Sequence, residues 1–340
     1  MGDIRFGIAG LGRLGKTHAM NIANTISGAQ LVAACSVVEE ELAFANNELG
    51  VNETYSTYEE MVNSPNIDAV CIVTPSGFHT EQICLAMEKG LHVFSEKPLG
   101  LEIEDIERTV ETIQAHPDQV FQLGFMRRYD ESYQYAKEMV DKGELGELTV
   151  IRCYGIDPSA GLESFVKFAK SNNSGGLFAD MAIHDIDLVR WFSNKEVNRV
   201  WAMGKNAAYP ELDDANELET GAAMMQLEDK TTAIIVAGRN AQHGYHVETE
   251  LIGTKGMLRV AAVPEKNLVS VFNEHGVVRP TSQNFPERFK GAFLNEMKEF
   301  ITCIKEKRQP DVSAYDGLQG TKIAAALQES VDKNQIVDVN

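Results

Sequence analysis

The sequence lacks several features that would assign it to common functional classes. Its five cysteines are scattered and form no CxxC pair, so neither a disulfide framework nor a zinc site is indicated. An odd, scattered set of this kind suggests reduced thiols and a cytoplasmic location. No apolar run approaches the length of a membrane span. The sequence offers no cluster of metal ligands either, so we expect no metal cofactor.

Positive charge is scarce. The chain has 31 lysines and arginines against 50 aspartates and glutamates, which gives a formal net charge of −19. A protein that binds the phosphate backbone needs a basic surface, and an anionic membrane would repel this chain. We therefore expect neither nucleic acid nor a membrane as a partner.

An alternating pattern indicates the first of two domains, for which 340 residues suffice. Short apolar runs predict strands at 4–10, 29–36, 69–74, 91–94 and 120–125. Periodic segments between them predict helices at 13–26, 39–49, 79–89 and 103–116. Strands that alternate with helices indicate a parallel, doubly wound sheet. We assign residues 1–123 to an α/β domain of this kind.

The pattern changes after residue 123. A helix is expected at 130–142, a strand at 148–157 and a helix at 177–192. Strand-like segments follow from 197 to 280, and helices at 287–306 and 314–332 end the chain. Successive strands without intervening helices indicate an antiparallel sheet. Residues 124–340 are therefore expected to form an α+β domain with a mainly antiparallel sheet.

The segment GLGRLG places Gly10, Gly12 and Gly15 between the first predicted strand and the first helix. In a dinucleotide site the first glycine makes a tight turn, the second lets the backbone approach a pyrophosphate, and the third allows close packing of helix and strand. We expect these glycines, with Arg13 and Leu14 between them, to contact a dinucleotide at the helix N-terminus. The alternative is a glycine-rich turn with a structural role only.

The ribose end of such a site is less usual here. An acid is expected about 20 residues on, at the tip of the second strand, but Ser36 occupies that place and the first acids are Glu39 to Glu41. No arginine or lysine lies nearby to receive a 2′-phosphate. Ser36 can hydrogen-bond either cofactor, and the local negative charge favours NAD over NADP.

A carboxylate and an imidazole are spaced four residues apart in GLFADMAIHDIDLVRWF, which is expected to be an amphipathic helix. Residues i and i+4 share a helical face, so Asp180 can orient His184 and fix its tautomer. The alternative is an exposed helix pair that contributes about 0.2–0.5 kcal/mol and nothing else. Lys97 precedes Pro98 and should project from the carboxyl edge of the parallel sheet, where ligands bind. A solvated lysine is the alternative there.

Several motifs occur in an order that resembles a known family. They are GIAGLGRLGKTHAMN, VTPSGFHTE, VFSEKPLG, QLGFMRRYD, GGLFADMAIHDIDLVRWF and PDVSAYDGLQGTKIA. Together they resemble the family of glucose–fructose oxidoreductase and inositol dehydrogenase (Gfo/Idh/MocA), and GFMRRYD with the DMAIHDID segment is most similar to its inositol dehydrogenases. The resemblance implies an N-terminal Rossmann domain, and a C-terminal domain with a large open sheet through which subunits form dimers or tetramers.

The resemblance also implies site residues. Cofactor contacts are expected from the TP turn with its following histidine and from the EKP motif, namely Thr74, Pro75, His79, Glu96 and Lys97, with a possible cis peptide at Pro98. Asp180 and His184 match the catalytic pair of the second domain. Contacts to a cyclic polyol are expected from Met126, Arg127, Asp157 and Tyr245. For Arg127 and Arg128, solvation or an ion pair with Asp130 is the alternative.

The resulting hypothesis is an NAD-dependent inositol dehydrogenase without a metal. It would oxidise a ring hydroxyl of myo- or scyllo-inositol to 2-keto-myo-inositol, with His184 as base and Lys97 stabilising the developing negative oxygen. Three alternatives remain open. The substrate could be another sugar or cyclitol, or the protein a non-catalytic cofactor-binding regulator. Tyr133 and Lys137 form the YxxxK signature of short-chain dehydrogenases, but the GxxxGxG of that family is absent, so we expect this pair to face solvent.

Overall fold

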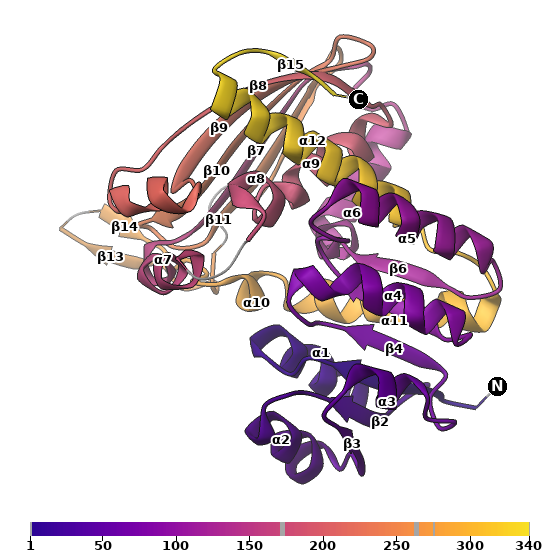
Figure 1. Ribbon diagram of the computed structural model, residues 1–340. Coiled ribbons are helices and arrows are strands. Elements are labelled where there is room, and N and C mark those ends of the chain that lie inside the picture. The colour runs from indigo at the N-terminus through magenta and orange to yellow at the C-terminus, as the bar shows by residue number, and fades with distance from the viewer. Residues whose placement is uncertain (1, 171–173, 262–264, 275, 340) are drawn as a thin grey trace. The chain divides into compact units, whose positions relative to one another are not determined.

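The computed structural model describes residues 2–170, 174–261, 265–274 and 276–339 (Figure 1). The chain forms two compact units, which are described separately. The first comprises residues 1–126 and 291–321, and the second residues 127–290 and 322–340. Residues 291–321 thus belong to the first unit, whereas the sequence-based division gave them to the second domain. The boundary at residues 123 and 124 stays a proposal.

The first unit contains a six-stranded parallel sheet in the order β3-β2-β1-β4-β5-β6 (Figure 1). This order is that of a doubly wound dinucleotide-binding fold, so the predicted fold class is confirmed for this unit. Its strands are β1 (Ile4–Ala9), β2 (Ala29–Cys35), β3 (Glu53–Tyr55), β4 (Ala69–Ile72), β5 (His92–Glu96) and β6 (Phe121–Gly124). Its helices are α1 (Arg13–Asn24), α2 (Glu39–Leu49), α3 (Tyr58–Val62), α4 (His79–Glu88), α5 (Ile103–Ala115) and α11 (Lys290–Glu306), with the short 3-10 turn η1 (Ser76–Phe78).

Helix α11 explains why a late segment belongs to the first unit. Its apolar side chains join the buried cluster of β1, α1 and β5. The ring of Phe300 lies 6.0 Å from the rings of both Phe6 and Phe94. Burial of aromatic side chains contributes strongly to the stability of a core. The apolar face of α11 therefore fixes the helix to the parallel sheet despite its distance in sequence.

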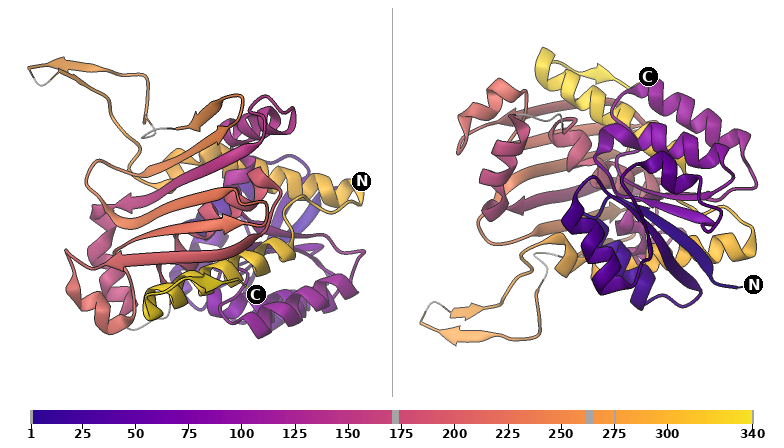
Figure 2. Two further views of the ribbon diagram at one scale, coloured as in Figure 1. Left: turned by 90° about the horizontal axis from the view of Figure 1, so that it is seen from above. Right: turned by 60° about the horizontal axis from the view of Figure 1, so that its bottom comes forward.

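The second unit contains a seven-stranded sheet in the order β12-β11-β7-β10-β9-β8-β15. Only β7 and β10 pair in parallel, so the sheet is mainly antiparallel, as predicted. The strands are β7 (Leu148–Pro158), β8 (Val197–Lys205), β9 (Thr220–Leu227), β10 (Thr232–Ala241), β11 (His246–Gly253), β12 (Met257–Val260) and β15 (Val337–Asp338). A separate ribbon of β13 (Val271–Asn273) and β14 (Gly276–Val278) extends away from this sheet (Figure 2).

Helices cover one face of this sheet. Helices α8 (Gly176–Asp180) and α9 (Ile183–Ser193) contact β7 and β10 (Figure 1). The other helices of the unit are α6 (Glu131–Asp141), α7 (Leu162–Ala169) and α10 (Phe285–Arg288), with 3-10 turns η2 (Met126–Tyr129), η3 (Ser159–Gly161) and η4 (Pro210–Ala215). Helix α12 (Ala314–Lys333) is divided between the two units. Along β9, exposed and buried side chains alternate, because helices bury one face of the sheet and leave the other face uncovered.

Two predicted helices are each broken in the structure. The helix expected at 177–192 is α8 followed by α9, and the helix expected at 287–306 is α10 followed by α11. Helix α9 is not amphipathic either, because nine of its eleven residues are buried. The short elements β3, α3, α7, β14 and β15 were not predicted, since segments of two to eight residues carry little periodic signal. The region of strand-like segments predicted from 197 to 280 lies partly outside the described residues, at 262–264 and 275.

Candidate active site

The glycine turn of the first unit has the geometry that a dinucleotide requires. Gly10 has a φ of +85°, and a Cβ there would lie 2.5 Å from the carbonyl oxygen of Val73. A Cβ on Gly15 would overlap the carbonyl oxygen of Gly10, whereas a Cβ on Gly12 would meet nothing within 4 Å. Thus Gly10 and Gly15 allow close packing, and Gly12 keeps the space above the turn open for a ligand.

Helix α1 begins directly after this open space. Gly12 is its N-cap, and no side chain caps the helix. The first N–H groups of a helix attract an anion, so this end suits a pyrophosphate. Arg13 is exposed and Leu14 half-buried in the first turn. The NAD contacts predicted for Arg13 and Leu14 stay predictions.

The structure brings a carboxylate to the ribose end of the same site. The hydroxyl of Ser36 donates a hydrogen bond to Glu41 Oε2 at 2.6 Å, and the backbone N–H of Leu11 donates to the same oxygen at 3.3 Å. Glu41, in the first turn of α2, therefore lies beside the tip of β2, where Ser36 occupies the place of the expected acid. The sequence showed three consecutive acids but could not tell which one reaches the glycine turn.

His79 joins two of the predicted cofactor segments. Its Nδ1 lies 2.7 Å from the carbonyl oxygen of Pro98, and its Nε2 lies 2.8 Å from that of Thr74. Burial lowers the pKa of His79, and the two carbonyl contacts oppose that shift. Both ring nitrogens face the backbone, so His79 holds the turn around Thr74 and Pro75 against the EKP segment.

The EKP segment follows β5 at the carboxyl edge of the parallel sheet. The peptide between Lys97 and Pro98 is cis, as the resemblance suggested. Lys97 is half-buried, and its backbone N–H donates to Glu96 Oε2 at 3.3 Å. Glu96 itself is buried and contacts His18. Lys97 therefore lies where ligands bind in open α/β sheets, while Glu96 is turned into the core.

Two buried arginine–aspartate pairs organise the polar residues of the second unit. Arg127 Nη1 lies 2.5 Å from Asp185 Oδ1, and Arg128 Nη2 lies 2.5 Å from Asp187 Oδ1. All four side chains are at most 7% exposed. The arginines come from η2 and the aspartates from α9, which explains why a helix with charged residues is buried on most sides. Neither arginine is solvated or paired with Asp130, the alternatives raised by the sequence.

Three of the predicted substrate residues lie close together in this unit. The Tyr245 hydroxyl contacts the Arg127 guanidinium, and the carboxylate of Asp157 is close enough to raise the pKa of Tyr245. Burial raises the pKa of Tyr245, so its hydroxyl remains protonated. Burial also raises the pKa of Asp185, and the Arg127 guanidinium opposes that shift. The cluster offers a guanidinium, a hydroxyl and carboxylates.

Met126 is the fourth predicted substrate residue. It is buried and belongs to the first unit.

Asp180 and His184 do not share one continuous helix. Asp180 is the last residue of α8, and His184 lies in the first turn of α9, where it is 8% exposed. Asp180 Oδ2 accepts a hydrogen bond at 2.9 Å from Arg239, whose guanidinium also lies over the ring of Phe165. The prediction of a single amphipathic helix was therefore wrong, because α8 ends at Asp180 and α9 begins at Ile183, and Arg239 of β10 binds the Asp180 carboxylate. The orienting contact between Asp180 and His184 stays a prediction.

The YxxxK pair is not a solvent-facing pair. Tyr133 is fully buried, and its hydroxyl lies 3.1 Å from Thr249 Oγ1. Lys137 is bound to Asp141 one turn further along α6. The prediction of exposure was wrong for Tyr133, because this face of α6 packs on β11. Tyr133 is part of the core of the second unit.

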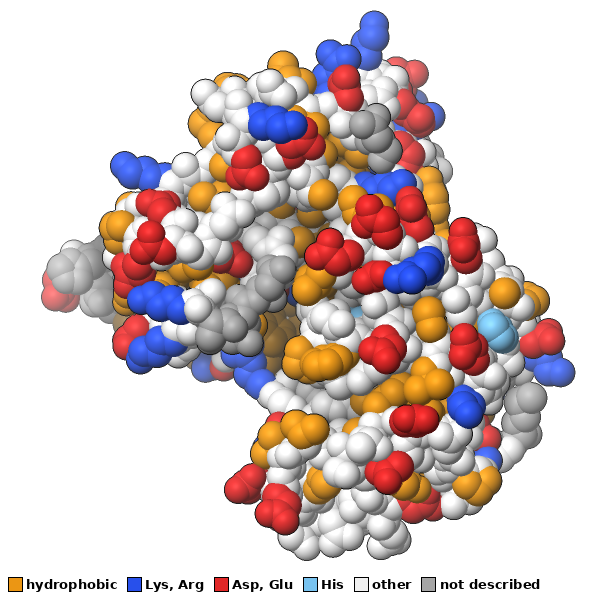
Figure 3. Space-filling view, viewed as in Figure 1, with side chains coloured by type: hydrophobic (Ala, Val, Ile, Leu, Met, Phe, Trp, Pro, Cys, Tyr) orange, Lys and Arg blue, Asp and Glu red, His pale blue; other side chains and the backbone are white. Residues whose placement is uncertain are grey.

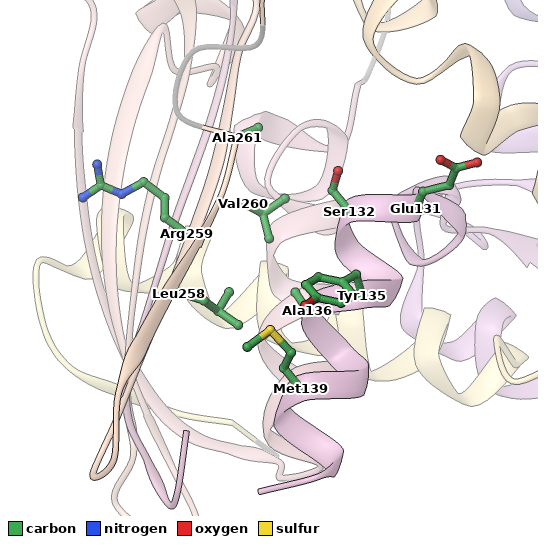
Figure 4. Close-up of a pocket in the computed structure, with 9 residues that line it drawn as sticks. All are labelled: Glu131, Ser132, Tyr135, Ala136, Met139, Leu258, Arg259, Val260 and Ala261. Atoms are coloured by element: carbon green, nitrogen blue, oxygen red, sulfur yellow. The ribbon is translucent and has the colours of Figure 1, made fainter. Parts of the chain in front are cut away.

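A groove of about 440 Å³ lies between α6 and the edge strand β12 (Figure 4). Tyr135, Met139, Leu258 and Val260 line it, while Arg259 points to the other side of the sheet. None of the predicted site residues contributes to this groove. Acidic and basic side chains are interspersed over the face drawn in Figure 3, which presents no single basic patch there. Among the described residues, no helix is long and apolar enough to cross a membrane.

Comparison with protein families assigns both halves of the chain. Residues 4–125 match the model of an oxidoreductase family with an NAD-binding Rossmann fold, GFO/IDH/MocA. Residues 133–259 match the C-terminal domain of the same family. The chain belongs to the GFO/IDH/MocA family. The NAD-binding fold and the oxidoreductase class predicted from the sequence are thereby confirmed.

Members of the GFO/IDH/MocA family that resemble this chain include inositol dehydrogenases. The chain is 63% identical to scyllo-inositol dehydrogenase from Lactobacillus casei, solved with bound NAD(H) and scyllo-inositol, over 99% of both chains with a TM-score of 0.97. It is 46% identical to myo-inositol 2-dehydrogenase from Lactobacillus plantarum, over 99% of this chain and 100% of that chain, also with a TM-score of 0.97. A myo-inositol 2-dehydrogenase from Thermotoga maritima is 31% identical over 98% of each chain.

Proposed function

We propose that this protein is an NAD-dependent inositol dehydrogenase that oxidises a ring hydroxyl of scyllo- or myo-inositol to 2-keto-myo-inositol. The observation that carries the proposal is the 63% identity to an enzyme solved with NAD(H) and scyllo-inositol. Identity to the Lactobacillus plantarum myo-inositol enzyme is lower, at 46%. We therefore favour scyllo-inositol as the preferred substrate.

The polar cluster of the second unit supports a cyclic polyol as substrate. A polyol needs several donors and acceptors at fixed positions, because each unpaired hydroxyl in a closed site is costly. Arg127 and Tyr245 supply donors, and Asp157 supplies an acceptor. Asp185 holds the Arg127 guanidinium, so the donor does not need to be ordered when substrate binds.

The chemistry requires a base and a positive charge near the reacting hydroxyl. Bound NAD⁺ supplies the hydride acceptor. We assign removal of the hydroxyl proton to His184, since a neutral imidazole is an effective base near neutral pH. Asp180 is proposed to orient it. The Lys97 ammonium is proposed to stabilise the negative charge that develops on the oxygen.

Cofactor choice follows from the carboxylate at the ribose end. Glu41 is bound to Ser36 and to the Leu11 N–H, so its negative charge is fixed beside the glycine turn. A 2′-phosphate would meet this charge, whereas a 2′-hydroxyl can donate to it. We therefore propose NAD as the working cofactor and only weak use of NADP.

The uncovered face of the seven-stranded sheet supports self-association. Trp201, Met203 and Met224 are 40–50% exposed on β8 and β9 of this face. Apolar side chains grouped on a surface mark a site of protein association. We propose a homodimer or homotetramer formed through this sheet, in the cytoplasmic location indicated by the scattered cysteines.

The test is turnover of a substrate panel by the purified protein. Scyllo-inositol, myo-inositol and glucose are each offered with NAD⁺ or NADP⁺, and formation of reduced cofactor is followed by absorbance. We expect turnover of an inositol with NAD⁺. Lys97→Met should abolish it, and Lys137→Met, which removes a lysine paired on α6, should leave it unchanged. Turnover of glucose alone would indicate another sugar dehydrogenase, and cofactor binding without turnover would indicate a regulator.

A further inference from the structure

Three titratable side chains meet inside the first unit, and one of them is the glutamate of the EKP segment. They are His18 from α1, Glu96 at the end of β5 and Glu296 from α11. One nitrogen or oxygen of each lies within 4.8 Å of the others. His18 and Glu296 are 0% exposed and Glu96 is 5% exposed. This cluster could not be predicted from the sequence, because Glu296 comes from the late helix α11 that packs in the first unit.

Glu96 accepts hydrogen bonds with both carboxylate oxygens. His18 Nε2 lies 2.8 Å from Glu96 Oε1, and the Lys97 backbone N–H donates to Glu96 Oε2 at 3.3 Å. The His18 ring is held between aromatic rings, with Phe94 at 5.2 Å and Phe293 at 5.7 Å. The Glu96 carboxylate therefore links the Lys97 backbone N–H to the imidazole of His18, which is held between the two aromatic rings.

Glu296 has no such partners. Neither of its carboxyl oxygens is hydrogen-bonded to any described residue. The amide of Gln122, which lies nearby, donates instead to the Glu296 backbone carbonyl at 2.8 Å. An ionised carboxylate buried in this way is strongly disfavoured, so the group keeps its proton. Burial raises the pKa of Glu296 well above its ordinary value, and the charge of Glu96 adds to that rise.

Two other titratable groups face the cluster, the Cys71 thiol on β4 and the His79 imidazole on α4. Cys71 is fully buried, and burial raises its pKa well above the ordinary value. His79 lies close enough to Glu96 to be influenced by its charge, and burial lowers the pKa of His79. Both groups are therefore neutral near pH 7 and bring no positive charge that could stabilise an ionised Glu296. The imidazole of His18 is already engaged by Glu96.

A proton explains the cluster better than a metal ion does. His18 Nε2 and Glu96 Oε1 are in direct hydrogen-bond contact at 2.8 Å. A metal held by both would require His18 Nε2 to give up the proton that it donates to Glu96, and would break this hydrogen bond. A proton on Glu296, by contrast, removes the unmatched charge without moving any of the three side chains.

We propose that Glu296 is a neutral carboxylic acid at working pH, so that no second negative charge lies beside Glu96. Glu96 can then accept hydrogen bonds from His18 and from the Lys97 backbone, which fixes the turn that carries the Lys97 side chain. The protonation state stands by itself. Its effect on turnover rests on the proposed function, in which Lys97 acts on the substrate.

The first experiment tests the proton on the NAD-bound protein. Glu296→Gln keeps the shape of the side chain and has no proton to lose, and Glu306→Gln removes an exposed glutamate of the same helix as a control. A wild-type-minus-Glu296→Gln infrared spectrum at pH 8 should contain the carbonyl band of a protonated carboxylic acid, and the Glu306→Gln difference spectrum should not. Its absence from the first spectrum would overturn the proposal, as would stoichiometric divalent metal in the purified protein.

Stability against pH gives a second measure of the same proton. Above the ordinary pKa of 4.5, the unfolded chain ionises Glu296 while the folded chain does not. The wild-type ratio of folded to unfolded protein should therefore fall, relative to Glu296→Gln, by up to about tenfold per pH unit between pH 5 and 8. Glu306→Gln should show no such trend. A constant difference between wild type and Glu296→Gln would mean that Glu296 is ionised in the folded state.

Turnover tests whether a neutral side chain suffices at this position. Glu296→Gln and Glu296→Leu should both keep the wild-type kcat and the wild-type Kd for NAD⁺, because neither variant places a negative charge beside Glu96. Glu296→Met replaces the leucine variant if that variant does not fold. A kcat lowered on the order of tenfold in both neutral variants would mean that turnover needs the ionised carboxylate, and would overturn the proposal. If the wild type oxidises no inositol, the proposed function fails, and the infrared and stability measurements still decide the proton.

Discussion

The buried pair of Arg127 and Asp185 gives the sharpest prediction about stability. Asp185→Asn keeps the shape of the side chain and removes its charge, which leaves the Arg127 guanidinium buried without a counter-ion. The side chains are 3% and 0% exposed, so water cannot replace the lost carboxylate. Other neighbours of Arg127 include the neutral hydroxyls of Tyr245 and Tyr133 and the ring of Phe289, whose centroid lies 5.9 Å from the Arg127 guanidinium.

The expected cost follows from this burial. Breaking a buried ion pair by removing one partner costs about 3–5 kcal/mol. For a unit of this size, each kcal/mol lowers Tm by about 2–4 °C, so the second unit should unfold about 6–20 °C lower. Urea denaturation followed by circular dichroism measures the free energy of unfolding directly.

Two further variants control this experiment. Glu163→Gln breaks the exposed pair with Lys167, whose side chains are 69% and 75% exposed, and should leave the free energy of unfolding nearly unchanged. Arg127→Met combined with Asp185→Leu removes both charges and should be less destabilised than Asp185→Asn alone. A loss below about 1 kcal/mol in Asp185→Asn, similar to that of Glu163→Gln, would refute the reasoning.

Three other predictions concern the cofactor and the base. Glu41→Gln should raise kcat/KM with NADP⁺ by roughly tenfold or more, because it removes a fixed negative charge near the 2′-phosphate. The control variant Glu39→Gln, on the same helix, should not raise it. Equal effects of the two variants would exclude Glu41 as the residue that selects NAD⁺. His184→Ala should lose turnover while its Kd for NAD⁺, measured by calorimetry, stays constant; a retained rate would remove His184 from the mechanism. Gly12→Val should fold with a wild-type Tm but bind NAD⁺ weakly, because a side chain at this position occupies only the open space above the turn. Gly15→Val should lower Tm, because its side chain would overlap the Gly10 carbonyl oxygen. Normal NAD⁺ binding by Gly12→Val would contradict the assignment of the open space to the cofactor.

The fold of the first unit could be predicted from local patterns because its signals are local. Apolar runs alternate with periodic segments, and GLGRLG stands between a strand and a helix, which is the context that a dinucleotide turn requires. Each of these features lies within about 30 residues. The main omissions there were β3 and α3, which are too short for a periodic signal.

The polar contacts of the candidate site could not be predicted in the same way. The spacing of Asp180 and His184 suggested one helix, but Arg239 from β10 binds Asp180, and the helix is interrupted before His184. Arg127 was expected to be a substrate contact, yet nothing in the sequence identified Asp185, 58 residues away, as its partner. Periodicity cannot report a contact that closes only when distant segments pack.

The sequence by itself determined the class of the molecule: a parallel α/β unit with a glycine turn, a mainly antiparallel second sheet, and the family that these motifs indicate. Tertiary structure decided which charges are neutralised and where, as with Glu41 at the ribose end, Asp185 beneath Arg127 and Glu296 beside Glu96. The reason is physical. Backbone conformation depends on near neighbours along the chain, whereas the state of a buried charge depends on every group that folding brings within a few ångströms of it.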